Sequence, residues 1–386
     1  MCYTGSEFLT EVGFSLRIVV KVGTSTLAHA GGRLNIRCVE TLCKVLSDLK
    51  NDGNEVILVS SGAIGMGVGK LNLRERPTDM PTKQAAAAVG QGQLMRAWDE
   101  VFRAYDFPTS QVLLTRDDLR ARQRFLNARN TFAELMDWGV LPIVNENDTV
   151  SVSELKFGDN DCLASLLVNL IGADLYINLT SAPGVYAANP QEVPDAGILE
   201  CVEDVAGLDL GRMCGGKTSV GTGGMYSKLQ AARRAAQLGV PTLILPGREA
   251  DVLARAFAGE AVGTWVRPEE HAIPRRKFWL AYQSDPAGTV LVDAGAAEAL
   301  LSKGSSLLPG GVRQVLGNFQ KGALVRVARL GESDSHASLG VGLSNYSAAD
   351  LRKIMGLRRH EVAAILGDAH YPEVIHRDNL LMDAAI

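Results

Sequence analysis

The sequence lacks three features that define large classes of protein: a long apolar segment, a paired-cysteine pattern and an excess of basic residues. No apolar run approaches the roughly 18 residues of a membrane-spanning helix. Residues 1–15 contain acidic but no basic side chains, so we expect no secretory signal. With 39 Lys and Arg against 43 Asp and Glu, the composition argues against a general binder of nucleic acid or of anionic membranes.

Two further absences concern cysteine spacing and dinucleotide binding. The 6 cysteines include no CxxC pair, so they indicate thiols of a reducing compartment rather than a disulfide framework or a zinc site. We therefore expect a cytoplasmic protein. No G-x-G-x-x-G sequence occurs, so a dinucleotide-dependent oxidoreductase has no support.

What the chain does contain is an alternation of apolar runs and helical patterns along its first two thirds. The runs predict strands at 16–21, 55–59, 110–114, 140–144, 174–179 and 241–245. The helical patterns lie at 35–50, 82–104, 124–137, 160–170 and 225–238. This order predicts an α/β domain in which helices sandwich a mostly parallel sheet. In such sheets, ligands bind beyond the carboxyl ends of the strands.

A Pro- and charge-rich segment then separates the α/β region from a second region of different composition. Short β-type runs at 289–293 and 323–330, with one helical stretch at 347–356, predict a small, mostly β domain. We divide the 386 residues into an N-terminal extension, an α/β domain, a connector, a β domain and a tail, at 1–15, 16–268, 269–285, 286–376 and 377–386.

Three Gly- or Ser-rich segments follow strands of the predicted sheet: 21–27, 60–67 and 221–228. Backbone N–H groups in such loops bind anions, and the third segment leads into a helix whose N-terminus is electropositive. Lys21 and Lys228 lie in two of them, and phosphoryl transfer requires positive charge on the moving group. The alternative is three ordinary tight turns with solvated lysines.

The acidic segment 145–161 is the other candidate site, because it combines several carboxylates and amides between a strand and a helix. These side chains could hold a substrate ammonium, a hydrated metal or the two lysines. The alternative is a polar surface loop in which Asp159 or Asn160 caps the helix. Long connections in compact domains are, however, often functional.

One phosphate-loop pattern is best read as accidental. Residues 211–218 fit G-x-x-x-x-G-K-[ST], with Lys217 and Thr218 in the last two places. That motif functions between a buried strand and a helix. The preceding residues here are acidic and irregular, and the following SVGTGGM cannot begin a helix.

Taken in order, KVGTS, SSGAIG, NEND, FGDND and GTGGMYSK resemble the amino acid kinase family, and residues 304–322 resemble a PUA domain. The resemblance runs from about residue 17 to 376. It implies the amino acid kinase fold followed by a PUA-like domain. It also implies ATP-dependent phosphorylation of the γ-carboxylate of L-glutamate to L-glutamyl 5-phosphate, the first step towards proline.

The resemblance assigns roles to individual residues. It implies that the catalytic residues are Lys21, Lys228, Asp159 and Asp161. It implies that glutamate is held by Ser61, Gly62, Asp148 and Asn160. It implies that ATP is bound by Lys21, Thr180, Ser181, Thr222, Gly223, Gly224, Met225, Tyr226, Ser227 and Lys228. Mg²⁺ is expected to enter on the ATP phosphates, without a protein metal site of its own.

The family also implies regulation and partners. We expect feedback inhibition by proline near 146–161, a separate glutamyl-phosphate reductase that takes the product, and a homo-oligomer. One departure stands out, because Thr180-Ser181 replaces the Thr-Asp that is usual in the family. We expect this change to affect nucleotide contacts and to leave the chemistry of the two lysines intact.

Two alternatives stay open. The first is another amino acid kinase, acting on N-acetylglutamate or aspartate, although the PUA-like domain and the GDND sequence favour free glutamate. The second is an RNA-binding PUA protein with a degenerate kinase domain. From residue 283 onward, however, ten Lys and Arg face eleven Asp and Glu, a net charge of −1. RNA binding favours a basic surface, so we do not expect RNA as a partner.

Overall fold

The computed structural model describes residues 15–29, 33–151, 160–214, 224–249, 251–282, 286–331, 337–367 and 371–382. The chain divides into two compact units, Met1–Ala272 and Ile273–Ile386. Among the described residues, no helix is both long enough and apolar enough to cross a membrane.

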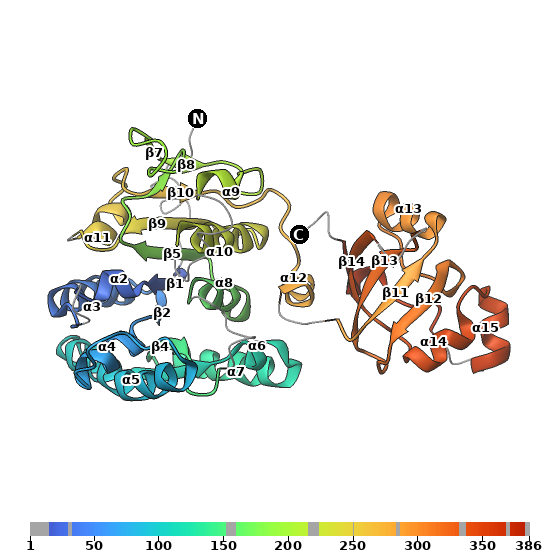
Figure 1. Ribbon diagram of the computed structural model, residues 1–386, viewed down its shortest axis with the longest axis horizontal. Helices are drawn as coiled ribbons and strands as arrows, with labels where there is room; N and C mark the ends of the chain where they lie inside the picture. Colours follow the sequence, from blue (N-terminus) through green and yellow to red (C-terminus); the bar gives the residue numbers. More distant parts are fainter. Residues whose placement is uncertain are drawn as a thin grey trace. The chain divides into compact units, whose positions relative to one another are not determined.

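The N-terminal unit is built on one sheet with the strand order β3-β4-β2-β1-β5-β9-β10-β8 (Figure 1). These strands are β3 (Thr109–Leu114), β4 (Leu141–Glu146), β2 (Glu55–Ser60), β1 (Arg17–Val22), β5 (Leu175–Thr180), β9 (Thr242–Pro246), β10 (Thr264–Val266) and β8 (Cys201–Val202). The pairs from β3 to β9 are parallel, and β10 runs antiparallel to β9. The predicted mostly parallel sheet is confirmed.

Helices cover both faces of this sheet, because successive apolar side chains of each strand point to opposite faces and both faces must be buried. Ile18, Val20 and Val22 of β1 pack into a core with α3 (Ile36–Asn51), α5 (Met80–Phe102) and α11 (Val252–Phe257). The intervening β1 residues Val19 and Lys21 therefore face the opposite layer, since neighbouring side chains of a strand point to opposite sides. That layer contains α7 (Arg122–Asp137), α8 (Asn160–Ile171) and α10 (Met225–Gln237). Figure 1 shows α3 and α11 on one side and α8 and α10 on the other.

Shorter elements complete the unit. They are α2 (Thr24–Leu27), η1 (Arg103–Tyr105), α6 (Arg116–Arg120), α9 (Leu210–Met213) and a small pair of strands, β6 (Val185–Tyr186) and β7 (Ile198–Leu199). Asn35 is the N-cap of α3, because its side chain accepts a hydrogen bond from the backbone N–H of Cys38 at 3.2 Å.

The expectation of a glycine-rich loop over 60–67 is wrong for most of that segment. Only Ser61 and Gly62 form the turn, and residues Ala63–Lys70 form the helix α4. Its glycines allow α4 to pack very closely against α5. A Cβ atom on Gly67 would lie 1.8 Å from the carbonyl oxygen of Ala86, and one on Gly90 would lie 1.8 Å from that of Ala63. Close packing therefore outweighs the low helix propensity of glycine.

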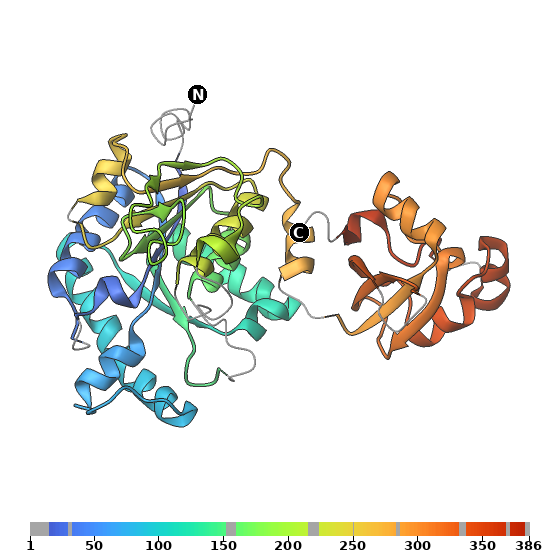
Figure 2. The ribbon, with the colours of Figure 1, turned by 45° about the horizontal axis from the view of Figure 1, so that its top comes forward.

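The C-terminal unit, coloured orange to red in Figures 1 and 2, contains a second sheet with the strand order β12-β11-β13-β14-β15. Its strands are β11 (Gly288–Val292), β12 (Val312–Gly317), β13 (Leu324–Arg329), β14 (Ala337–Leu343) and β15 (Leu380–Met382). Its helices are α12 (Arg275–Tyr282), α13 (Ala294–Lys303), η3 (Pro309–Gly311), α14 (Ala348–Ile354), α15 (Arg359–Leu366) and η4 (Arg377–Asn379). This sheet is the β part of the small C-terminal domain that the sequence predicts.

The ends of the C-terminal unit differ from the boundaries expected from sequence. The expected connector 269–285 contains α12, which packs against β14 and β15. The expected tail 377–386 contains β15, which pairs with β14 through Leu381 and Val341. Leu380 and Leu381 are buried in this pairing. Apolar side chains close to the end of the chain thus extend the sheet.

The contact between α4 and α5 yields a stability prediction. We expect Gly67→Ala to lower the free energy of unfolding by about 2 kcal/mol or more, because overpacking typically costs about 1–3 kcal/mol and here the obstacle is a backbone carbonyl. Urea unfolding followed by tryptophan fluorescence measures this change, since Trp98 is buried on α5.

Gly92→Ala is the matched control in the same helix pair. No atom lies within 4 Å of a Cβ built on Gly92. This variant should raise stability by about 0.5–1 kcal/mol through helix propensity alone. A shift of both variants in the same direction would contradict the close-packing explanation.

Candidate active site

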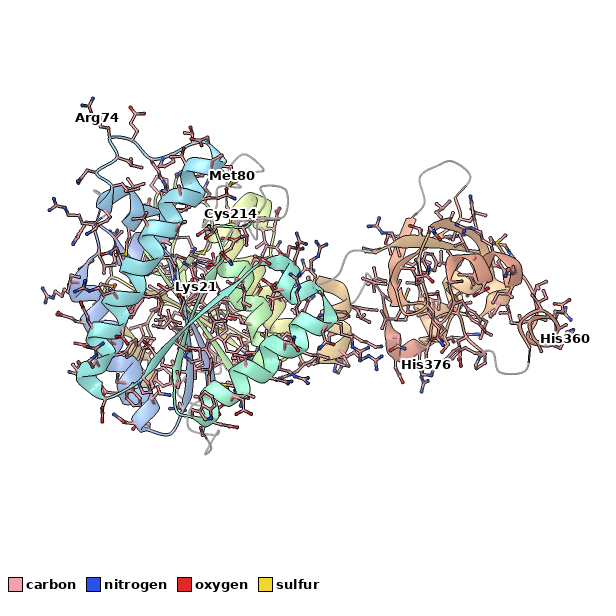
Figure 3. The ribbon with its side chains drawn as sticks, turned by 90° about the horizontal axis from the view of Figure 1, so that it is seen from below. Lys21, Arg74, Met80, Cys214, His360 and His376 are labelled. Carbon is pink, nitrogen blue, oxygen red and sulfur yellow. The ribbon has the colours of Figure 1, made fainter. Side chains whose placement is uncertain are left out.

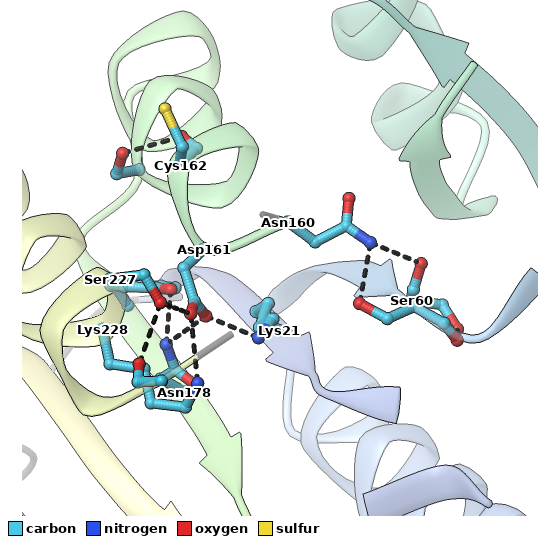
Figure 4. Close-up of polar contacts among 12 residues, drawn as sticks. Lys21, Ser60, Asn160, Asp161, Cys162, Asn178, Ser227 and Lys228 are labelled. Atoms are coloured by element: carbon cyan, nitrogen blue, oxygen red, sulfur yellow. Dashed lines mark hydrogen bonds and ion pairs between the residues drawn. The ribbon is translucent and has the colours of Figure 1, made fainter. Parts of the chain in front are cut away.

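A buried carboxylate holds two lysines at the carboxyl end of the sheet (Figure 4). Asp161 contacts the Nζ atom of Lys21 at 2.5 Å through Oδ1 and that of Lys228 at 3.1 Å through Oδ2. The side chains of the three residues are 0%, 2% and 6% exposed. Two ammonium groups gathered at one carboxylate are an arrangement that suits an anionic ligand beside them.

Each member of this cluster comes from a different element. Lys21 lies near the carboxyl end of β1, Asp161 lies in the first turn of α8, and Lys228 lies in the first turns of α10. A carboxylate at a helix N-terminus is favoured by the helix dipole. Figure 3 shows Lys21 inside the N-terminal unit, whereas Arg74 and His360 project from the surface.

Two further donors fix the orientation of Asp161. Asn178 of β5 donates from Nδ2 to Oδ1 at 2.8 Å, and Ser227 of α10 donates from Oγ to Oδ2 at 2.8 Å. Asn178 is the register partner of Lys21 in the parallel pairing of β1 with β5. Both carboxylate oxygens therefore accept from two side chains each, and the carboxylate is held in one orientation.

A second polar group lies beside this cluster. Asn160, the residue before Asp161, donates from Nδ2 to Ser61 Oγ at 2.7 Å, to Asn145 Oδ1 at 2.9 Å and to the carbonyl oxygen of Ser60 at 3.3 Å. Asn145 donates in turn to Gln91 Oε1 at 2.8 Å. These contacts connect β2 and β4 with the beginning of α8.

The turn after β2 presents a helix start to the same region. Gly62 has φ +112°, a conformation that favours glycine, and among the described residues no side chain caps α4 at this position. The first N–H groups of a helix require partners, and a ligand carboxylate can supply them.

A pocket of about 240 Å³ lies at the start of α10. Its lining includes Ala182, Val185, Tyr186, Met225 and Tyr226. Cys214 also lines it, and burial raises the pKa of that thiol above its usual range. A thiol with a raised pKa is protonated at neutral pH, so Cys214 is poorly suited to act as a nucleophile.

The structure brings together many of the residues expected from sequence. Lys21, Asp161, Ser227 and Lys228 form the buried cluster, and Ser61, Gly62 and Asn160 form the group beside it. Thr180 and Ser181 lie at the carboxyl end of β5, buried and exposed respectively. Gly224, Met225 and Tyr226 begin α10, and Asp148 lies in the turn after β4.

Some expected residues fall outside the part of the chain that the structure describes. They are Asp159, Thr222, Gly223 and the phosphate-loop-like pair Lys217 and Thr218. Within the described part, no group of three or more His, Cys, Asp or Glu side chains is placed to hold a metal ion.

The sequence-based site omitted Asn178 and Gln91. Asn178 is a polar residue inside an otherwise apolar buried strand, LYINLT, and this exception was the available signal. Gln91 lies in an Ala- and Gly-rich helix, where its position gave no such signal. Its role becomes visible only when α5 is packed against β4.

Comparisons with known proteins show which family the chain resembles. A model of the amino acid kinase family matches residues 16–246, and a model of the PUA domain matches residues 288–366. A glutamate 5-kinase of Nitratidesulfovibrio vulgaris is 63% identical over 384 residues, covering 98% of this chain and 100% of the relative. A glutamate 5-kinase of Oleidesulfovibrio alaskensis is 60% identical over 370 residues, covering 96% of each chain.

Similar proteins include a more distant relative and a solved structure. A glutamate 5-kinase of Caldanaerobacter subterraneus is 46% identical over 368 residues, covering 95% of this chain and 98% of the relative. The solved carbamate kinase from Giardia lamblia bound to AMP-PNP has a TM-score of 0.48 and 17% identity, covering 66% of this chain and 99% of that one.

The buried cluster yields a second stability prediction. Asp161→Asn leaves two buried ammonium groups without the carboxylate between them, and removing one partner of a buried ion pair costs about 3–5 kcal/mol. We expect a loss of that size in the free energy of unfolding. Urea unfolding monitored by tryptophan fluorescence measures it.

Glu100→Gln is the matched control, because it removes an exposed ion pair with Arg96 on α5. Its effect should stay within about 0.5 kcal/mol. Equal effects of the two substitutions would show that the Asp161 cluster does not stabilise the carboxyl ends of the central strands.

Proposed function

The chain belongs to the amino acid kinase family, and on this premise we propose that it transfers the terminal phosphoryl group of ATP to the γ-carboxylate of L-glutamate. It is a kinase, and the glutamate 5-kinases to which it is similar match it over nearly their whole length. The observation that carries the proposal is the pair of buried lysines that share Asp161 beside a polar group of amide and hydroxyl side chains.

The two lysines supply the electrostatics of phosphoryl transfer. The moving phosphoryl group carries negative charge on its oxygens, and catalysis is mostly positioning and charge stabilisation. Asp161 holds both Nζ atoms on one carboxylate, so the ammonium groups are placed before ATP arrives. This preorganisation lowers the reorganisation needed in the transition state. Asp159, which lies outside the described residues, is proposed to act with Asp161.

Asp161 does not fit the role of a direct Mg²⁺ ligand, because its two oxygens already accept from Lys21, Lys228, Asn178 and Ser227. We propose that Mg²⁺ is held through the ATP phosphates and supplies charge neutralisation there. For the nucleotide itself, the pocket at the start of α10 offers Tyr186, Met225 and Tyr226 as apolar walls. Thr180, Ser181 and residues 222–228 are proposed as its polar partners.

Glutamate is proposed to bind at the group formed by Ser61, Gly62, Asn160 and Asp148. The uncapped start of α4 suits a carboxylate, and Asp148 suits the substrate ammonium. The γ-carboxylate attacks the phosphorus of the terminal phosphoryl group. A bond from that oxygen to phosphorus forms, the bond to the bridging oxygen breaks, and ADP leaves.

The full-length relatives favour free glutamate over the alternative acceptors. N-acetylglutamate and aspartate remain as the competing substrates in the test. For the C-terminal unit, the net charge of −1 from residue 283 onward favours a regulatory role over RNA binding.

Three further features of the protein are proposed with the activity. L-glutamyl 5-phosphate is a reactive acyl phosphate, so a separate glutamyl-phosphate reductase is the expected consumer of the product. A homo-oligomer is the expected state. The described cysteines form no disulfide, which fits a cytoplasmic location.

An acyl-phosphate trap tests the activity. With Mg-ATP and hydroxylamine, we expect hydroxamate from L-glutamate and little from L-aspartate or N-acetyl-L-glutamate. Lys21→Ala should lower the rate about 100-fold or more, because an aligned charge at the reacting group is lost. Lys70→Ala, at the exposed end of α4, is the control and should leave the rate unchanged. A folded protein that gives no hydroxamate from L-glutamate refutes the proposal.

Feedback by proline is tested separately. The segment from Glu146 to Ser151 follows Asn145, which hydrogen-bonds to Asn160 of the proposed glutamate site. A small amino acid bound at this segment would therefore compete with glutamate. We expect proline to lower the initial rate at low glutamate and to lose its effect at saturating glutamate. An initial rate at low glutamate that is insensitive to saturating proline rules this regulation out.

A further inference from the structure

A chain of side-chain amides connects α5 with the proposed glutamate site. Gln91 accepts through Oε1 from Asn145 Nδ2, and Asn145 accepts through Oδ1 from Asn160 Nδ2. Asn160 Nδ2 also donates to Ser61 Oγ. Gln91 and Asn145 are both buried, so water cannot replace these bonds without rearrangement.

Backbone groups determine the direction of this chain. The N–H of Glu146 donates to Asn145 Oδ1 at 2.9 Å, so the other end of that amide is the donor that faces Gln91. The carbonyl oxygen of Ser60 accepts from Asn160 Nδ2, so Nδ2 is also the end that faces Ser61. Neither amide can turn over without losing a backbone partner.

This direction decides what Ser61 offers to a ligand. Because Ser61 Oγ already accepts a hydrogen bond from Asn160, its own hydrogen is directed away from Asn160. A hydroxyl group has one hydrogen to donate, and a carboxylate can only accept. Ser61 is thereby set as a donor to a carboxylate of the substrate.

Only the oxygen of the Gln91 amide takes part. Among the described residues, Nε2 of Gln91 is buried and has no hydrogen-bond partner. Position 91 therefore requires an acceptor and makes no use of the donor. If the acceptor is lost, Asn145 is left with a buried N–H group that must find another partner, which displaces its contact with Asn160.

A second glutamine of α5 supports the same segment of chain. Gln84, two helical turns before Gln91, donates from Nε2 to the carbonyl oxygen of Ser151 at 3.1 Å. The hydroxyl of Ser151 donates to Glu146 at 2.7 Å. Helix α5 therefore holds both ends of the described segment 145–151.

We propose that Gln91 is a positioning residue for glutamate binding, acting through Asn145 and Asn160 to orient the hydroxyl of Ser61 towards a substrate carboxylate. This inference rests on the proposed function. Gln91 lies on the α5 face of the sheet, whereas Asp161 and the two lysines lie on the opposite face. Its effect is therefore confined to the proposed glutamate site and does not extend to the proposed phosphoryl site.

The test is steady-state kinetics of Gln91→Met in the full chain. Met fills a similar volume and has no strong acceptor. We expect the KM for L-glutamate to rise about tenfold, as a hydrogen bond to a charged group is weakened. The KM for MgATP should stay within about twofold and kcat within about threefold, because uniform substrate binding is lost and transition-state stabilisation is kept.

Gln91→Glu is the rescue variant, because its carboxyl group keeps an acceptor for Asn145 Nδ2 at position 91. Its KM for L-glutamate should return to within about threefold of wild type. If Gln91→Met does not fold, Gln91→Asn withdraws the same amide by one methylene and should raise the KM in the same way. Gln93→Met, a half-buried glutamine of the same helix outside the chain of amides, is the control and should leave all three constants unchanged.

The outcomes separate this inference from the proposed function. A wild-type protein that does not phosphorylate L-glutamate overturns both. An active wild type with an unchanged glutamate KM in folded Gln91→Met or Gln91→Asn overturns the positioning role alone. Equal rises in the KM values for glutamate and MgATP show that Gln91 acts only through general stability.

Discussion

The structure of the site depends on one buried carboxylate. Asp161 joins β1, β5 and α10 at the beginning of α8, and each of its oxygens accepts from two side chains. Burying one carboxylate and two ammonium groups is costly, and such clusters are weak stabilisers compared with apolar packing. The benefit is geometric, because two positive charges are fixed at a defined separation beside the carboxyl ends of the strands.

The site divides between the two layers of helices. Lys21, Asn178 and Thr180 point from β1 and β5 towards α8 and α10, where the charges gather. Asn145 and Ser60 point from β4 and β2 towards α5, where Gln91 and Trp98 bond to them. Asn160 and Asp161 are adjacent in sequence at the start of α8 and reach into both layers. This adjacency connects the proposed amino-acid site with the proposed phosphoryl site.

The sequence was sufficient for six strands of the sheet (β1 to β5 and β9), for the longer helices of the N-terminal unit and for the positions of both lysines after or near strands, because apolar periodicity and the position of a loop after a strand are local properties. It did not predict the short strands β8 and β10 or most of the shorter helices. It was insufficient where packing decides. The glycines of α4 suggested a loop, yet the segment is a helix that packs on α5 so closely that the carbonyl oxygen of Ala86 leaves room only for glycine at position 67. Asn178 and Gln91 likewise acquire roles through partners that lie far away in sequence, at Asp161 and Asn145.

The close approach of α4 and α5 also bears on the amide chain. Gly90, which lies against the carbonyl oxygen of Ala63, directly precedes Gln91. Ala63 in turn directly follows Ser61 and Gly62, the turn at which glutamate is proposed to bind. The same contact that packs the two helices therefore sets how far Gln91 lies from β4 and how the start of α4 faces the ligand. A side chain at position 67 or 90 would separate the helices and move both at once, which explains why these two positions require glycine while Gly92, on the open side of α5, does not.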